Sequence, residues 1–236
     1  MNGKQLRLYA ITDRSWLHGD TLESQVEQAI KGGVTMVQFR EKEMEDKTLL
    51  IEAKKVQIVC KRYQVPFIIN DNVKLAKEIN ADGVHLGEGD LSIKEARKIL
   101  GAEKIIGATA KTIERALSAQ EEGADYLGCG AIFGSNTKKD AKVMTISFLQ
   151  EICRAVKIPV VAIGGITIEN VEQLKGTGIA GVAVISGLFA QKNIEYSAKK
   201  MRECSKFCSS NQKRKYENWT DRKVEKSENS VDDCRK

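Results

Sequence analysis

Three polar side chains close one apolar run of the chain: Gln38, Arg40 and Lys42. Alternate side chains of an extended strand share a face, so these three are expected to point the same way. Arginine offers a planar fork of donors and lysine a mobile point charge, the usual pair for binding phosphate. The spacing therefore indicates a site for a polyanion. The simpler alternative is a strand that runs out into a charged loop in water.

Polar or glycine-rich segments also follow the other apolar runs. They are 70–71 (Asn-Asp), 87–90 (Gly-Glu-Gly-Asp), 107–109 (Gly-Ala-Thr), 133–140 (a polar loop with two lysines), 164–165 (Gly-Gly) and 185–187 (Ile-Ser-Gly). Each alone is typical of a turn or a solvated loop. What they mean depends on whether the fold brings them to one place.

Eight apolar, strand-like runs alternate with eight amphipathic segments. The predicted strands are 7–12, 35–40, 66–70, 83–86, 104–108, 126–130, 159–164 and 181–186, and the predicted helices are 21–31, 46–63, 73–80, 92–100, 112–122, 147–156, 167–175 and 194–207. Strands this continuously apolar are typical of parallel strands buried on both faces. The count and order predict one α/β domain over residues 1–210, a (β/α)₈ TIM barrel. A doubly wound sheet is the alternative, but no GxGxxG turn follows the first run.

Barrel enzymes build their chemistry at the carboxyl ends of the strands, where all these polar segments would then meet. Asp71 and Asp90 are hard oxygen donors suited to Mg²⁺, which takes one or two carboxylates plus phosphate oxygens of a substrate. Arg40, Lys42 and Lys138 supply positive charge and are the predicted catalytic residues. The predicted site holds a diphosphate together with a metal ion.

Two small-residue segments indicate a second phosphate site. The pairs at 164–165 and 186–187 follow the seventh and eighth predicted strands and would let backbone N–H groups approach a ligand. The loops after these two strands are where barrels frequently bind phosphate. A monophosphate beside the diphosphate is therefore expected.

Histidine chemistry is poorly supported. His85 lies among apolar residues of a predicted strand and is expected to be a hydrogen-bonded core residue, and His18 lies in a polar loop. With no further histidine, acid–base or nucleophilic schemes based on it are disfavoured. No Gly-x-Ser-x-Gly or Walker motif is present.

Composition narrows the class of protein. The 236 residues carry a net charge of +6, with 42% hydrophobic residues and no run long enough to cross a bilayer. The first residues lack the apolar core of a signal peptide, so the cytoplasm is expected. Residues 211–236 mix eight basic with six acidic residues and are predicted to be a charged, flexible tail. That excess is too small to indicate nucleic-acid binding. The six cysteines show no zinc-like spacing.

Several of these motifs, in this order, make the chain resemble the thiamine-phosphate synthases over roughly residues 6–205. They are Gln-Phe-Arg-Glu-Lys at 38–42, Asn-Asp at 70–71, His-Leu-Gly at 85–87 with Asp90, Thr-Lys-Lys-Asp at 137–140, Ile-Gly-Gly-Ile-Thr at 163–167 and Val-Ile-Ser at 184–186. The resemblance implies a barrel enzyme of thiamine biosynthesis. Such an enzyme condenses 4-amino-2-methyl-5-(diphosphooxymethyl)pyrimidine with thiazole phosphate and releases pyrophosphate.

The resemblance also implies roles for individual residues. The pyrimidine diphosphate would contact Gln38, Phe39, Arg40, Glu41, Lys42, Asn70, Thr109 and Lys138, and the thiazole phosphate would contact Ser135, Asn136, Thr137, Gly165, Ile185 and Ser186. Asp71 and Asp90 would bind Mg²⁺. The implied partners are these small molecules, with neither nucleic acid nor membrane; a homo-oligomer stays open.

Three alternatives remain. A thiazole tautomerase-like paralogue would share the fold without the synthase chemistry, but it would not need the cationic and acidic groups present here. A phosphosugar isomerase or aldolase would want a Glu or a Schiff-base Lys inside a strand, and no predicted strand carries a convincing one. In a non-enzymatic protein, the basic tail would act as an interaction arm.

Overall fold

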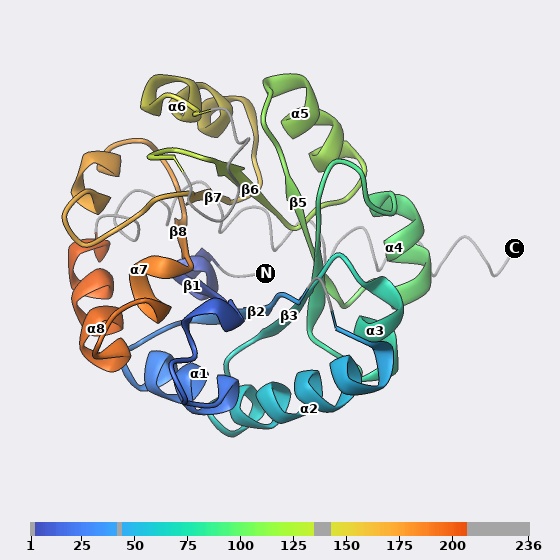
Figure 1. Cartoon of the computed structure of the whole chain (residues 1–236). Helices are drawn as coiled ribbons and strands as arrows, with labels where there is room; N and C mark the ends of the chain where they lie inside the picture. The colour runs from blue at the N-terminus through green and yellow to red at the C-terminus, as the bar shows by residue number, and fades with distance from the viewer. Residues whose placement is uncertain (1–2, 42–43, 135–142, 207–236) are drawn as a thin grey trace, which may run out of the picture.

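Eight parallel strands form a closed barrel in the computed structural model, which describes residues 3–41, 44–134 and 143–206. The strands pair in chain order from β1 to β8, and β8 pairs with β1 to close the barrel. Figure 1 looks down into the barrel, and the helices form a ring outside it. The predicted (β/α)₈ TIM barrel is confirmed.

The strands lie where the apolar runs predict them, with ends shifted by two residues at most. They are β1 (Leu8–Ile11), β2 (Met36–Phe39), β3 (Phe67–Asn70), β4 (Gly83–Leu86), β5 (Ile105–Thr109), β6 (Tyr126–Gly130), β7 (Val160–Ile163) and β8 (Gly181–Val184). They are short because a barrel strand needs only to span the buried layer, after which the polar segments begin.

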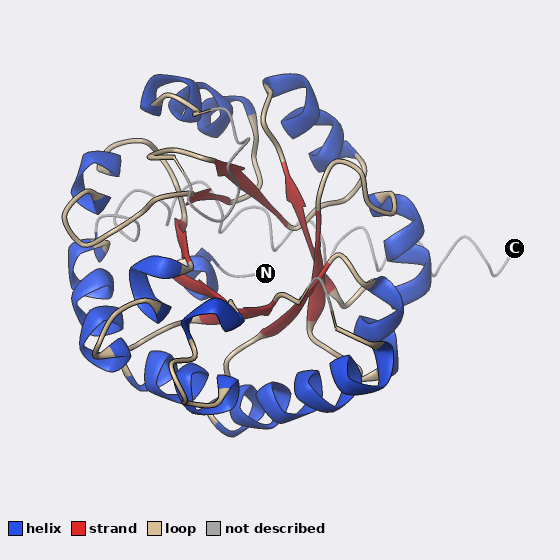
Figure 2. Cartoon of the chain, viewed as in Figure 1, coloured by secondary structure: helices blue, strands red, loops and turns tan. Residues whose placement is uncertain are grey.

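The helices are α1 (Leu22–Lys31), α2 (Asp46–Arg62), α3 (Val73–Glu78), α4 (Ile93–Leu100), α5 (Ile113–Glu121), α6 (Ile146–Ala155), α7 (Ser186–Phe189) and α8 (Ile194–Cys204). Three 3₁₀ helices accompany them: η1 (Gly3–Leu6), η2 (Arg14–Trp16) and η3 (Val171–Leu174). The ring of helices encloses all eight strands in Figure 2. Most helices begin at a side-chain cap, and α4 begins with a capping box of Ser92 and Glu95.

The predicted helix at 167–175 and the predicted strand at 181–186 differ from the structure. The segment 167–175 forms only the 3₁₀ helix η3, because the Asn170 side chain accepts from the Thr167 N–H at 2.9 Å and donates to the Gly165 carbonyl at 2.8 Å. These local bonds compete with a helical start. The last predicted strand is too long. The observed strand ends at Val184, and Ser186 instead begins the short helix α7, in which the Ile185 carbonyl accepts from Phe189.

The core has two layers. The outer layer fills the space between the strands and the helices and includes the buried side chains of Cys60, Cys129 and Cys153. The inner layer fills the barrel itself with Leu6, Tyr9, Ile11, Met36, Ile68, Tyr126, Val161, Ala180 and Ala183.

Within the described ranges, no helix has the length and apolar character needed to span a bilayer.

Candidate active site

The barrel brings the predicted site residues of β2, β3, β4 and β5 to one end, the carboxyl end of its strands. Phe39 pairs in register with Ile69, and Asn70 pairs with His85. The segments that follow these strands therefore start at similar heights on the same end of the barrel. Arg40, Asn70, Asp71 and Thr109 all lie at this end and keep part of their surface exposed.

Gln38 and Phe39 point to opposite sides of β2, as the alternation of a strand requires. Gln38 is 2% exposed, and its Nε2 donates to the Tyr9 hydroxyl at 2.7 Å inside the barrel. The Phe39 ring packs against Phe67 in the outer layer, with 6.2 Å between ring centroids. A substrate contact by Phe39, which the resemblance implies, would therefore fall to its backbone.

Arg40 is positioned through its backbone. Its N–H donates to the Thr12 Oγ1 at 3.0 Å, and the Thr12 N–H donates to the Gln38 carbonyl at 2.9 Å. Among the residues that the structure describes, no acidic side chain pairs with the Arg40 guanidinium. The charge of Arg40 is thus available to an anionic ligand.

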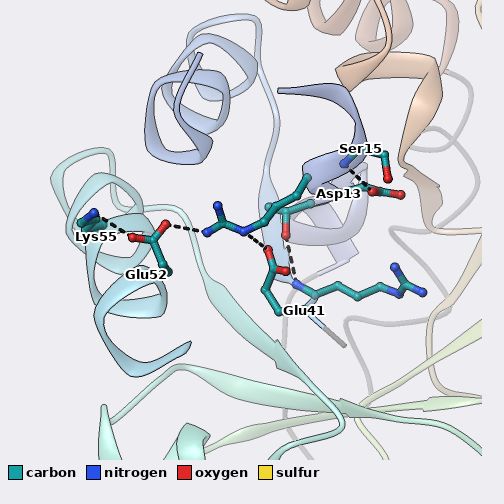
Figure 3. A network of polar contacts seen from close by, with 8 residues as sticks. Asp13, Ser15, Glu41, Glu52 and Lys55 are labelled. Carbon is teal, nitrogen blue, oxygen red and sulfur yellow. Dashed lines mark hydrogen bonds and ion pairs between the residues drawn. The ribbon is translucent and has the colours of Figure 1, made fainter. Parts of the chain in front are cut away.

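The Glu41 side chain is held by a neighbouring arginine. Its carboxylate accepts from the Arg14 Nε at 2.8 Å, and Arg14 also donates to Glu52 at 2.5 Å, which Lys55 contacts at 2.7 Å (Figure 3). Burial raises the pKa of Glu41, and the charge of Arg14 opposes that rise. Sequence reasoning missed Arg14, because its contact with Glu41 depends on the pairing of β1 with β2.

Asp71 has an unusual backbone. Its φ is +60°, in the left-handed region that residues other than glycine seldom occupy, although aspartate tolerates it better than most. Two bonds hold the turn: the Asp71 N–H donates to the His85 carbonyl at 2.8 Å, and the Asn70 Nδ2 donates to the Asp71 Oδ2 at 2.5 Å. Strain that persists in this way is common at functional sites. Asn70 thus acts here by orienting the Asp71 carboxylate.

Asp90 lies on the neighbouring loop, after β4. Its Oδ2 accepts from the Gly87 N–H at 2.6 Å, and a Cβ on Gly87 would lie 2.9 Å from the same oxygen. Across the described ranges no group of three His, Cys, Asp or Glu residues could hold a metal by itself. Two carboxylates on adjacent strand ends fit Mg²⁺, which completes its shell with water and substrate phosphate oxygens.

His85 and Thr109 are joined by a hydrogen bond. The His85 Nε2 lies 3.2 Å from the Thr109 Oγ1, and its Nδ1 lies 3.0 Å from the Tyr126 hydroxyl. His85 is hydrogen-bonded as predicted, but it is half-buried rather than part of the core. Sequence reasoning missed Tyr9 and Tyr126, because aromatic residues in an apolar strand are indistinguishable from ordinary core residues by pattern.

The predicted monophosphate segments meet the loop after β6. Gly165 has a φ of +64°, and a Cβ there would lie 2.7 Å from the carbonyl oxygens of both Phe133 and Gly134. The Phe133 N–H also donates to the Gly164 carbonyl at 3.0 Å. The loops after β6 and β7 therefore touch backbone to backbone, which requires glycine at position 165. Ile185 and Ser186 lie at the end of the adjacent strand β8.

Five predicted site residues lie outside the described part of the chain: Lys42, Ser135, Asn136, Thr137 and Lys138. Their roles stay predictions. The described members of the predicted diphosphate and metal site are Gln38, Phe39, Arg40, Glu41, Asn70, Asp71, Asp90 and Thr109.

A closed (β/α)₈ barrel with cationic, acidic and amide side chains at the carboxyl ends of its strands has the architecture of a barrel enzyme. The family model "Thiamine monophosphate synthase" matches residues 8–188, and the chain belongs to that family.

Curated relatives agree. The chain is 48% identical over 196 residues to a thiamine-phosphate synthase of Ruminiclostridium cellulolyticum, covering 83% of this chain and 93% of the relative. It is 50% identical over 198 residues to thiamine-phosphate synthase 2 of Streptococcus pneumoniae, with the same two coverages. Among solved structures, a thiamine phosphate pyrophosphorylase from Pyrococcus furiosus is 35% identical with a TM-score of 0.81, covering 88% of this chain and 99% of that one.

Proposed function

We propose that this chain is a transferase of thiamine biosynthesis, which condenses 4-amino-2-methyl-5-(diphosphooxymethyl)pyrimidine with thiazole phosphate to form thiamine phosphate and pyrophosphate. The observation that carries the proposal is the near-complete match to relatives named thiamine-phosphate synthase. The positions of Arg40, Asn70, Asp71 and Asp90 support it, because all four lie at or beyond the carboxyl ends of strands β2 to β4.

The diphosphate is the group that this site would bind most strongly. Arg40 supplies a guanidinium, and we assign Lys42 and Lys138 the same task of meeting phosphate oxygens. Asp71 and Asp90 would hold Mg²⁺, with Asn70 keeping the Asp71 carboxylate in place. When bound there, Mg²⁺ would neutralise charge on the departing pyrophosphate.

The proposed reaction breaks the bond between the pyrimidine methylene carbon and the diphosphate oxygen, and the electron pair leaves with pyrophosphate. The thiazole nitrogen then forms the new C–N bond with its lone pair. No proton needs to move in either step. This agrees with a site whose one nearby histidine, His85, has both ring nitrogens in hydrogen bonds with the protein. Electrostatic stabilisation of the leaving group by cationic residues would supply most of the catalysis.

We assign the thiazole phosphate to the other half of the barrel mouth, with Ser135, Asn136, Thr137, Gly165, Ile185 and Ser186 as its contacts. The support is the backbone contact between the loops after β6 and β7, which places exposed main chain beside the end of β8. We also propose a cytoplasmic location, which fits the free thiols of Cys60 and Cys129.

The test is incubation of the purified chain with both substrates and Mg²⁺, followed by measurement of thiamine phosphate and pyrophosphate. Equal amounts of the two products are expected, with neither formed when one substrate is omitted. A chain that binds thiazole phosphate but forms no thiamine phosphate would overturn the proposal and would favour the tautomerase-like alternative.

A further inference from the structure

A continuous chain of hydrogen bonds crosses the inside of the barrel. The Gln38 Nε2 donates to the Tyr9 hydroxyl at 2.7 Å, and the Tyr9 and Tyr126 hydroxyls are 2.9 Å apart. Tyr126 continues to the His85 Nδ1 at 3.0 Å, and the His85 Nε2 reaches the Thr109 Oγ1 at 3.2 Å. The chain thus joins Gln38 on β2 to Thr109 on β5 through strands β1, β6 and β4.

The residues of this series of hydrogen bonds fit the barrel interior, because glycines on neighbouring strands leave room for their rings. Tyr9 and Tyr126 are 1% and 0% exposed and pack edge to face, with 5.9 Å between centroids. A Cβ on Gly107 would collide with the Tyr126 ring, and a Cβ on Gly128 would lie 3.1 Å from the His85 Cε1. Glycine weakens the interior of a strand, so a glycine there often marks a place where another group must come close.

One direction of donation gives every proton of this series of hydrogen bonds an acceptor. In that direction Tyr9, which accepts from Gln38, donates its one proton to the Tyr126 oxygen. Tyr126 in turn donates to the His85 Nδ1, which leaves the proton of the neutral imidazole on Nε2 to be donated to Thr109. Burial raises the pKa of both phenols, so both stay protonated at neutral pH.

We propose that Tyr9, Tyr126 and His85 are positioning residues that set the hydrogen-bonding polarity of the pyrimidine site. With its Nε2 committed to Tyr9, Gln38 presents its Oε1 as an acceptor. With its oxygen already accepting from His85, Thr109 presents its hydroxyl proton as a donor. An aminopyrimidine has the complementary groups, since its exocyclic amine donates and its ring nitrogens accept. This inference rests on the proposed function, which brings that ring to Gln38 and Thr109.

The Tyr126→Phe variant reverses the polarity at Gln38. Without the Tyr126 oxygen, the Tyr9 proton finds its acceptor in the Gln38 Oε1, so the amide turns over. Gln38 then presents its NH₂ group to the substrate and opposes the amine instead of binding it. The Phe ring still fills the space beside Gly107, so the packing of the barrel is preserved.

The experiment compares two ligands: the 4-amino pyrimidine diphosphate and its 4-oxo analogue, which presents an oxygen in place of the amine. Dissociation constants are measured with Mg²⁺ present and thiazole phosphate absent, for the wild-type chain and Tyr126→Phe. Tyr63→Phe is the matched control, because it removes a hydroxyl that donates to Glu27 at 2.6 Å between α1 and α2. We expect Tyr126→Phe to raise the dissociation constant of the amino ligand about tenfold. The dissociation constant of the oxo ligand should rise less or fall, and the control should bind both ligands as the wild type does.

The outcomes separate the two proposals. A wild-type chain that neither binds nor converts the amino ligand contradicts the proposed function. If the wild-type chain binds and converts the amino ligand, and the ratio of the two dissociation constants is the same in Tyr126→Phe as in wild type, the positioning role is overturned. If Tyr126→Phe does not fold, Tyr9→Phe is the second variant. It frees the Gln38 amide to turn either way, so discrimination between the ligands should fall, and unchanged discrimination would overturn the inference.

Discussion

The Arg14 guanidinium, just beyond β1, lies 2.8 Å from the Glu41 carboxylate, just beyond β2. Glu41 directly follows Arg40, so this pair decides which way the acidic side chain turns. Because Arg14 holds the Glu41 carboxylate, this acid does not compete with an anionic ligand for Arg40. The network in Figure 3 continues through Glu52 to Lys55, which fixes Arg14 from the side of α2.

Replacing Arg14 should impair both stability and substrate binding. Arg14→Met leaves the Glu41 carboxylate, which is 9% exposed, without its charged partner. We expect a loss of roughly 1–3 kcal/mol in the free energy of unfolding, measured in urea, because an unpaired buried charge is costly. The KM for the pyrimidine diphosphate should also rise. In Arg62→Met, whose guanidinium is 60% exposed and 3.6 Å from Glu27, a change within about 0.5 kcal/mol is expected.

Glu52 should contribute to the loss of stability in acid. Its pKa is lowered from 4.5, first by the hydrogen bond from Lys55 and then by that from Arg14. A lowered pKa gives stability that is present above the unfolded value and is lost as pH falls through the folded value. Glu52→Gln should therefore lose less unfolding free energy than wild type between neutral pH and about pH 3. An equal loss in both proteins would contradict this prediction.

Glu41→Gln should have the opposite pH signature, since burial raises the Glu41 pKa. The stability contribution of a raised carboxyl pKa is present below the unfolded value and is lost as pH rises through the folded value. Relative to wild type, Glu41→Gln should therefore lose more stability on acidification. Urea unfolding curves at the same two pH values provide the measurement.

The metal assignment predicts a large effect at Asp71. Asp71→Asn keeps an oxygen that can accept from Asn70 but removes the charge that would bind Mg²⁺. We expect kcat/KM to fall on the order of a hundredfold and the Mg²⁺ concentration for half-maximal rate to rise. Asp20→Asn, at an exposed position beside Ser24 and Gln28, is the control. Normal Mg²⁺ dependence in Asp71→Asn would exclude Asp71 as a ligand.

Crowding the barrel interior at Gly107 should destabilise the protein. The Cβ of Gly107→Ala collides with the Tyr126 ring, and overpacking of this kind costs typically about 1–3 kcal/mol. The midpoint of urea unfolding should fall accordingly. Gly89→Ala is the matched control, because no atom lies within 4 Å of its added Cβ. Equal stabilities of the two variants would show that the ring moves aside without cost.

From the sequence we could predict the features that depend on local pattern, together with those that follow from the carboxyl-end rule of parallel barrels. Apolar runs located the eight strands, and the carboxyl-end rule was enough to group Arg40, Asn70, Asp71 and Thr109 at one end of the barrel. The helix predicted at 167–175 was wrong, because the side-chain bonds of Asn170 do not alter the apolar pattern.

The contacts that sequence reasoning missed join side chains from different strands, which only the folded barrel brings together. Arg14 and Glu41 are 27 residues apart, and Tyr9 and Tyr126 are 117 apart. Nothing in their local sequence marks either pair. Gly107 and Gly128 did carry a signal, since both interrupt strands, but the ring that each one accommodates could not be named from sequence.

The left-handed backbone at Asp71 has an evolutionary consequence. Glycine adopts that conformation with no steric cost, so Asp71→Gly removes the carboxylate and relaxes the turn at the same time. The barrel is therefore free to lose the carboxylate at position 71 while keeping its architecture. Retention of aspartate at this position then has to be maintained by selection for chemistry, and a lineage released from that selection would drift towards a folded, inactive relative.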